Sequence, residues 1–296
     1  MEEQPTPPRV TALLVSHNNA TALRRAIQAL EQSTARETLE ILVVDNGSWD
    51  ECPTLDAEFP NVVFMRLSKY FGKTKALNVG MRTAKAELIF FLAPEVEVRP
   101  DTVSLLAGKL EAAAEAVGVC PLLLDGEGNA PPQAFRLPAT TDLLSIWREN
   151  TEFPRVDIDP NAERQAVELV PFQAMLVRKY FVKGLNYLDD RYGEAGADLE
   201  LAFQIRRAGK KILFFPAVHA TWVPTIAEVP TPAARSLLST DRGSAYASFV
   251  GKHRGLLAGL WFRVQAAFSA LAALRFGVFA GVLSGQKVDG SQTTEL

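Results

Sequence analysis

The chain has 296 residues, 48% of them hydrophobic, and a formal net charge of -3. It can bury a large core as one big domain or two small ones, and it has no overall basic field that would favour a nucleic-acid partner. Two cysteines, Cys52 and Cys120, are too few for a disulfide framework or a zinc site. Residues 1–8 lack the basic and apolar segments of a signal peptide, so we expect a polar lead-in and a cytoplasmic protein.

Strand and helix patterns alternate through the first third of the chain. Apolar runs with short polar connections predict buried strands, and Leu23, Ile27 and Leu30 have helical spacing. This alternation predicts a parallel sheet wound in βα units. The expected strands are Val10–Val15, Leu39–Val44, Val62–Leu67 and a run from Leu88, with a helix over about Lys73–Ala84.

The stretch Leu88–Val98 joins an apolar strand to two carboxylates. Pro94 cannot donate to a ladder and marks the end of the strand, and Glu95 and Glu97 follow it. Ligands of open α/β sheets bind outside the carboxyl ends of the strands. The two acids are therefore placed to hold a divalent metal and a diphosphate; a surface loop whose acids face water is the alternative.

Beyond residue 101 the pattern is less regular. The region 124–166 is long and rich in proline, glycine and polar residues, which is typical of a functional or mobile segment. We expect Val167–Val170 and Ala174–Val177 to form a strand pair. The remaining expected elements are helices over Thr102–Ala116, Leu143–Trp147 and Asp198–Ala208, the last ended by Gly209, and strands over Val117–Cys120 and Lys211–Phe215, the last closed by Pro216.

The C-terminal tail has a composition of its own. Six Lys or Arg and no acid lie between Arg242 and Lys287, and the mostly apolar stretch 255–285 is interrupted by Arg263 and Arg275. These charges prevent a clean transmembrane span of about 20 residues. A basic helix or helix pair on a membrane surface fits the pattern, and docking on this protein's own core or on a second subunit fits it equally.

Five motifs occur in one order along the chain: Val43–Ser48, Ala76–Gly80, Phe91–Glu95, Leu188–Tyr192, and Asp198–Leu201 with Arg206–Gly209. Together they resemble the family-two glycosyltransferases with the GT-A fold, especially the rhamnosyltransferase-like branch. The resemblance implies an α/β fold with a Rossmann-like, mostly parallel sheet flanked by helices and followed by a helical tail. It implies a GT-A domain over 9–250, with a nucleotide-sugar-binding half at 9–123 and an acceptor half at 124–223, and a basic apolar tail at 251–296.

The resemblance also implies donor-binding residues. Ser16 and Asn18 would line the nucleotide pocket, and Asp45 would accept a hydrogen bond from the base or ribose. Lys75, with Lys73 beside it, would reach the diphosphate. Asn78 would close the donor site or tie two loops together. The alternatives are that Asp45 caps its own turn, that the lysines form a solvated face, and that Asn78 has a purely structural role.

The metal motif departs from the family pattern. The family ends its fourth strand with an acidic metal-binding element, whereas this chain has Ala93-Pro94-Glu95. Glu95 keeps the charge and can coordinate Mg²⁺ or Mn²⁺, with Glu97 as a second candidate, but Ala93 has no ligand atom. Where relatives carry a late histidine this chain has Trp222, which leaves His219 as a weaker candidate for the metal or the diphosphate.

The catalytic motif departs as well. The family's acidic pair is replaced by Ala197-Asp198, so Asp198 would be the general base and its acidic neighbour is missing. We expect the loss of that like charge to lower the pKa of Asp198. The alternative role for Asp198 is a helix N-cap.

Two functions therefore stand at this point. The first is an inverting glycosyltransferase that uses a nucleotide-diphosphate sugar and a divalent metal. Its acceptor would be a glycan or lipid-linked glycan, and the tail (251–285) would contact the inner face of a membrane or a second copy in a homodimer. The second is a catalytically impaired protein that binds a nucleotide sugar or acts as a scaffold. The distinguishing feature is whether Glu95 and Asp198 face one cleft.

Overall fold

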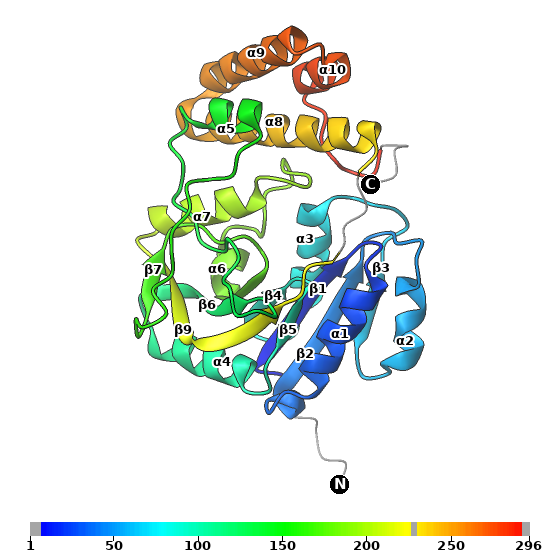
Figure 1. Ribbon diagram of the computed structural model, residues 1–296, viewed down its shortest axis with the longest axis vertical. Helices are drawn as coiled ribbons and strands as arrows, with labels where there is room; N and C mark the ends of the chain where they lie inside the picture. The colour runs from blue at the N-terminus through cyan, green and yellow to red at the C-terminus, as the bar shows by residue number, and fades with distance from the viewer. Residues whose placement is uncertain (1–6, 226–229, 292–296) are drawn as a thin grey trace.

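A computed structural model describes residues 7–225 and 230–291. A curled sheet with helices against it forms the lower part of the molecule, and a layer of helices forms the upper part (Figure 1). Residues 1–6 of the expected lead-in and 292–296 of the expected tail lie outside the described residues.

The first half of the sheet is parallel, as the alternating pattern predicted. The strand order here is β3-β2-β1-β4, with every neighbouring pair parallel. All five residues of β4 are buried, which explains its unbroken apolar run. Helix α1 packs Leu23, Ile27 and Leu30 into the core at their helical spacing. The elements of this half are β1 (Val10–Ser16), α1 (Ala20–Glu31), the 3₁₀ turns Arg36–Thr38 and Cys52–Thr54, β2 (Leu39–Asp45), α2 (Leu55–Glu58), β3 (Val63–Arg66), α3 (Lys73–Thr83) and β4 (Leu88–Leu92).

The second half of the sheet is mixed. Strand β8 lies antiparallel between β4 and β6, and β9 lies parallel to β6, so the described residues form one sheet of nine strands. The Glu95–Glu97 stretch turns into a short strand, β5, on the far side of β9. The elements of this half are β5 (Val96–Val98), α4 (Thr102–Ala112), β6 (Ala116–Leu124), α5 (Leu143–Glu149), β7 (Gln165–Val167), β8 (Ala174–Arg178), α6 (Lys179–Gly184), α7 (Ala197–Arg207) and β9 (Lys211–Trp222).

Two expectations for this half are wrong. The segments near 167 and 174 do not pair with each other, because β7 pairs with β9 whereas β8 pairs with β4 and β6. Pro216 does not close the last strand, which continues to Trp222. The register with β6 jumps from Pro121–Phe215 to Leu122–His219, so Pro216 lies in a bulge where its missing N–H interrupts no ladder bond.

The upper layer consists of α8 (Pro232–Arg254), α9 (Leu256–Ala272) and α10 (Phe276–Ser284), with α5 against them (Figure 1). The expected boundary between residues 250 and 251 falls inside α8. Trp147 holds α5 against α8, because its buried indole N–H donates to Ser239 O at 2.8 Å. No helix in the described ranges combines the length and the apolarity needed to cross a membrane.

Candidate active site

A cleft of about 250 Å³ opens at the carboxyl ends of β1 and β4, and we call it the β1–β4 cleft. Ser16 ends β1, Asn46 follows β2 and Glu95 follows β4, so three neighbouring strands deliver polar side chains to one edge of the sheet. This is the edge at which open α/β sheets bind ligands. The polar lining of the cleft is Ser16, His17, Asn19, Asn46, Tyr70, Lys73, Glu95 and Glu194.

Glu95 lines this cleft from a tight turn. The Val96 N–H donates to Ala93 O at 3.0 Å, and Glu95 O accepts from Val223 N at 2.8 Å, which fixes the backbone on both sides of the carboxylate. One carboxylate oxygen accepts from Asn19 Nδ2 at 2.6 Å. The second oxygen therefore remains available for a bound cation or hydroxyl.

Asn46 is a lining residue that the sequence reasoning did not single out. Its side chain is fully buried, and its Oδ1 accepts from Phe71 N at 3.0 Å. Its Nδ2 has no hydrogen-bond partner within the described part of the chain. A buried amide donor without a partner is costly, so this N–H₂ is suited to a ligand oxygen. Its only sequence signal was its position in the Asp45-Asn46-Gly47 turn.

Two of the predicted donor-binding residues shape the wall of the cleft instead of lining it. Asp45 Oδ1 accepts from Ser48 N at 2.9 Å, which is the turn-capping alternative. Asn18 Oδ1 accepts from Trp49 N at 2.9 Å, and Asn18 N donates to Ser48 Oγ. Both therefore fix the 46–49 loop, against which the His17 ring packs.

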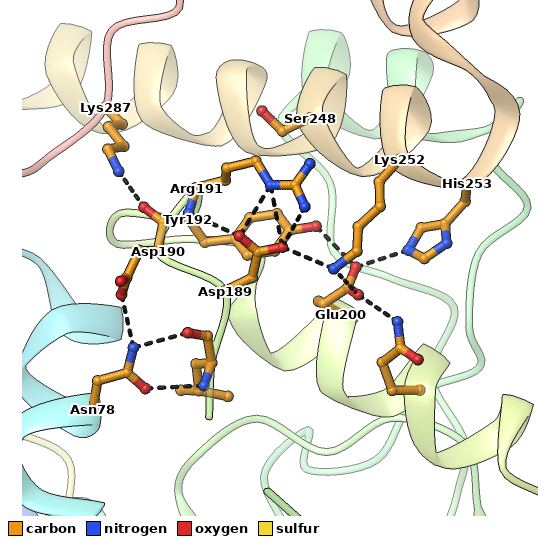
Figure 2. Close-up of polar contacts among 12 residues, drawn as sticks. Asn78, Asp189, Asp190, Arg191, Tyr192, Glu200, Ser248, Lys252, His253 and Lys287 are labelled. Carbon is orange, nitrogen blue, oxygen red and sulfur yellow. Dashed lines mark hydrogen bonds and ion pairs between the residues drawn. The ribbon is translucent and has the colours of Figure 1, made fainter. Parts of the chain in front are cut away.

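The two lysines of α3 have different surroundings. Lys73 lines the β1–β4 cleft, whereas the Lys75 ammonium lies 3.8 Å from the centroid of the Phe71 ring and borders another cavity, together with Asn78. The Asn78 amide makes three hydrogen bonds to the 188–190 loop and so holds that loop against α3 (Figure 2). Of these three residues, only Lys73 faces the cleft that contains Glu95.

A second cleft of about 250 Å³, the α7 cleft, contains Asp198. Asp198 is the second residue of α7, and Gly196 is the N-cap, so the expected N-cap role is wrong. Burial raises the pKa of Asp198, while the Leu199 N–H and the Lys73 charge oppose the shift. Desolvation therefore dominates the pKa of Asp198. The expected effect of the missing acidic neighbour at position 197 stays a prediction.

Glu194 lies between the two clefts and lines both of them. One of its carboxylate oxygens accepts from Tyr70 Oη at 2.5 Å and from Lys73 N, the first N–H of α3, at 2.9 Å. An acid is favourable at a helix N-terminus. Its charge also contributes to the raised pKa of Asp198, so a residue from the preceding loop supplies the like charge that Ala197 lacks.

Asp241 of α8 positions the loop that carries Glu194. One of its carboxylate oxygens accepts from Glu194 N at 3.0 Å and Ala195 N at 2.9 Å, and the other accepts from Val288 N at 2.8 Å. Burial raises the pKa of Asp241 to about 6, against the effect of these three N–H groups. The helical layer and the segment after α10 are thereby joined to the wall between the two clefts.

The three metal candidates do not come together. Glu97 pairs with Arg25 at 3.0 Å, and His219 Nδ1 lies 3.3 Å from an Arg99 nitrogen; neither lines the clefts described above. The described residues contain no cluster of three or more His, Cys, Asp or Glu side chains suited to a metal. Magnesium is commonly held by one or two carboxylates and substrate phosphates, so Glu95 fits a metal only together with a diphosphate.

An ionic network joins α7 to α8 and to the 189–191 loop (Figure 2). Glu200 of α7 accepts from Lys252 at 2.7 Å and pairs with His253 at 2.8 Å, both from α8. Lys252 also pairs with Asp189 at 2.8 Å. Burial opposes ionisation of Asp189, but hydrogen bonds from Arg191 and Lys252 outweigh it and lower its pKa. The network fixes α7 against α8.

Comparison with known proteins identifies the family of this chain. Residues 11–183 match the profile described as "Glycosyl transferase family 2", which is more than half of the chain. The chain therefore belongs to this family, and the expected class of enzyme and GT-A fold are confirmed.

Named relatives lie within the same class. The chain is 22% identical over 270 residues to the N-acetylglucosaminyl-diphospho-decaprenol L-rhamnosyltransferase of Mycobacterium tuberculosis (strain CDC 1551 / Oshkosh), covering 84% of this chain and 85% of that protein. It is 33% identical over 116 residues to the succinoglycan biosynthesis protein ExoO of Rhizobium meliloti (strain 1021), covering 38% of this chain and 32% of that protein.

Solved structures show the same fold at low sequence identity. GalNAc-T7 with UDP, GalNAc and Mn²⁺ matches at a TM-score of 0.60 and 17% identity, over 89% of this chain; the chain spans only 55% of that protein. The mannosyltransferase PcManGT of Pyrobaculum calidifontis, with GDP-Man and Mn²⁺, matches at 0.52 and 17%, over 91% of this chain and 76% of its own. S. aureus TarS 1-349 with UDP-GlcNAc matches at 0.54 and 12%, over 94% and 92%.

Proposed function

We propose that this enzyme moves a sugar from a nucleoside-diphosphate donor in the β1–β4 cleft to an acceptor hydroxyl in the α7 cleft. The observation that carries the proposal is that the two clefts adjoin. They share Lys73, Phe172 and Glu194, so Glu95 faces one side of a common wall and Asp198 the other. Glu95 and Asp198 thus do not face one cleft; they line two adjoining clefts, with Glu194 in the lining of both.

Asp198 is the general base in this proposal. It takes the proton of the acceptor hydroxyl, whose oxygen bonds to the anomeric carbon as the bond from that carbon to the diphosphate breaks. The electron pair leaves on the diphosphate, and attack opposite the leaving group inverts the configuration. A carboxylate with a raised pKa is a stronger base than an exposed one, which suits this role.

The groups that would bind the diphosphate line the β1–β4 cleft. Lys73 supplies a positive charge, and the unpartnered Asn46 amide supplies N–H donors. Ser16 lines the same cleft. Glu95 would hold Mg²⁺ or Mn²⁺ jointly with the diphosphate, and the bound cation would neutralise charge on the leaving group. Asp45 and Asn18 act through the loop that they fix.

The similarity to a rhamnosyltransferase named for a lipid-linked acceptor supports a hexosyl or deoxyhexosyl donor and a lipid-linked glycan acceptor. Such an acceptor places the enzyme at the cytoplasmic face of a membrane. The separation of Glu95, Glu97 and His219 favours one alternative, a nucleotide-sugar-binding protein with little or no turnover.

Thermal melting with UDP, dTDP or GDP, each with and without Mn²⁺, tests the donor site. A nucleotide at about one hundred times its dissociation constant should raise the free energy of unfolding by about 2.7 kcal/mol. We expect the metal-dependent part of the rise in melting temperature to disappear in Glu95→Ala. It should persist in Glu97→Ala, the matched control outside the cleft. Asp198→Asn should keep the nucleotide shift and lose transfer. A shift in the wild type without any transfer to lipid-linked acceptors would support the non-catalytic alternative.

A further inference from the structure

Helix α8 of the upper layer reaches the α7 cleft with two polar side chains. Arg242 and Tyr246 are four residues apart in α8 and therefore share one side of the helix, and both line the cleft that contains Asp198. Figure 1 shows α8 between the outermost helices, α9 and α10, and the rest of the molecule. The helical layer thus contributes to the cleft in which the acceptor hydroxyl is proposed to bind.

The hydroxyl of Tyr246 differs from that of the other buried tyrosine, Tyr192. The two residues are 5% and 3% exposed. Tyr192 Oη donates to Glu200 at 2.9 Å, whereas Tyr246 Oη has no hydrogen-bond partner among the residues that the structure describes. A buried tyrosine hydroxyl usually finds a partner, because the loss of water without one costs free energy. A hydroxyl without a partner in the wall of a cleft is suited to a ligand oxygen.

Tyr246 remains protonated beside Asp198. Burial raises the pKa of Tyr246, the Arg242 charge opposes this shift, and the Asp198 charge adds to it. The phenol can therefore both donate and accept a hydrogen bond at neutral pH. Because Tyr246 and Asp198 line one cleft of about 250 Å³, a single bound molecule can contact both of them.

The rest of the cleft wall combines one more hydroxyl with apolar surface. Thr74 is 1% exposed, and its Oγ1 also lacks a hydrogen-bond partner within the described part of the chain. Phe153, Pro171 and Phe172 line the cleft, and the centroid of the Phe153 ring lies 6.0 Å from that of Tyr246. An apolar wall with a few polar groups is typical of small-molecule sites. A sugar ring matches this combination, since it presents apolar C–H groups together with several hydroxyls.

The charges in the lining balance one another. The charged lining residues are two cations and two acids: Lys73, Arg242, Glu194 and Asp198. Of these, Arg242 also holds the end of α5, because its Nη2 donates to Asn150 Oδ1 at 2.9 Å. Clefts that attract ions are lined by one sign of charge, so this lining favours a neutral ligand.

We propose that Tyr246 holds a neutral acceptor sugar in the α7 cleft, through a hydrogen bond between its hydroxyl and a sugar oxygen other than the one that attacks. The inference deepens the proposed function and rests on it, because the attacking hydroxyl is the one whose proton Asp198 takes. Tyr246 binds and orients the acceptor and takes no proton itself. Helix α8 is then the element that positions the acceptor.

Saturation-transfer NMR of the full chain with octyl glycosides tests the site without a donor. The probes are octyl β-glucoside, octyl β-galactoside and octyl β-N-acetylglucosaminide, with n-octanol as the probe that lacks a sugar. We expect at least one glycoside to bind at least about tenfold more tightly than n-octanol. Tyr246→Phe keeps the ring and loses the hydroxyl, so its affinity for that glycoside should fall about threefold to tenfold.

Two other tyrosines serve as controls. Tyr180, in α6, is 56% exposed, and Tyr180→Phe should change the glycoside affinity less than about twofold. Tyr192→Phe removes the donor to Glu200 and should lower the melting temperature. Tyr246→Phe breaks no hydrogen bond within the protein, so it should melt at or above the temperature of the wild type and keep the nucleotide-dependent shift.

Three results would overturn the assignment of Tyr246. They are equal glycoside affinity in Tyr246→Phe and the wild type, no glycoside that binds the wild type more tightly than n-octanol, and a melting temperature of Tyr246→Phe as low as that of Tyr192→Phe. The last result would mean that the hydroxyl has a partner within the protein.

Transfer kinetics separate binding from catalysis. Tyr246→Phe should raise the acceptor KM with little change in kcat, whereas Asp198→Asn should abolish transfer and keep glycoside binding. A lower kcat at unchanged KM in Tyr246→Phe would count against a binding role. Glycoside binding without any nucleotide-dependent melting shift would leave the sugar site standing and count against the proposed function.

Discussion

Replacing Asn78 with alanine separates a structural role from a donor-binding role. Asn78 Nδ2 donates to Leu188 O at 2.8 Å and to Asp190 Oδ1 at 2.8 Å, and its Oδ1 accepts from Leu188 N at 2.9 Å. Asn78 is 2% exposed and Leu188 is 5% exposed, so water cannot readily replace the amide. The substitution therefore removes the hydrogen-bond partner of both the N–H and the C=O of Leu188.

The magnitude follows from these contacts. A buried polar group left unpaired costs about 1–3 kcal/mol, so two such groups should lower the free energy of unfolding by about 2–6 kcal/mol. For a chain of this size the melting temperature should fall by about 3–10 °C. Because Asn78 does not line the β1–β4 cleft, the affinity for GDP or UDP should change less than about threefold, or about 0.7 kcal/mol.

The assay is thermal melting of the free protein together with nucleotide titration by calorimetry. Lys75→Ala is the matched control on the same helix, since it loses only an exposed cation–π contact with Phe71, worth about 0.5–1 kcal/mol. The reasoning would be refuted if Asn78→Ala melted like the wild type and bound nucleotide at least tenfold more weakly. That result would indicate that Asn78 binds the donor nucleotide.

Three further predictions concern the helical layer. Because the pKa of Asp241 is raised to about 6, from about 4 in the unfolded chain, the folded chain holds a proton that the unfolded chain releases in this window. The contribution of Asp241 to the free energy of unfolding should thus fall as pH rises from about 4 to 6. Urea midpoints measured across this range should show that the Asp241→Asn variant lacks this pH-dependent loss. Trp147→Phe removes the indole donor to Ser239 O and should cost about 1–2 kcal/mol in urea unfolding; no loss would contradict the contact. Gly259→Ala places a Cβ 2.8 Å from Ala247 O and should cost about 1–3 kcal/mol, whereas its control Gly108→Ala, in open space on α4, should stabilise by about 0.5–1 kcal/mol.

The sequence alone determined the parallel half of the sheet and the position of Glu95. Three of the first four strands, β1, β2 and β4, are mostly apolar and mostly buried, and a turn or proline marks where each of them ends. The edge strand β3 is only partly buried. The strand pairing in the mixed half of the sheet was not predictable. The hydrophobic pattern of the sequence predicts that β7 and β8 are strands, but it does not indicate which strands they pair with.

The active site depended more strongly on tertiary structure. Asp198 was identifiable from its motif, but its raised pKa comes from burial and from Glu194, whose loop is held by Asp241, 47 residues beyond Glu194 in the chain. The lone Asn46 amide and the outward-facing aromatic residues of α9 became visible only once the chain was folded. Local sequence patterns encode periodicity and turns, whereas desolvation and hydrogen bonding depend on which distant segments enclose a group.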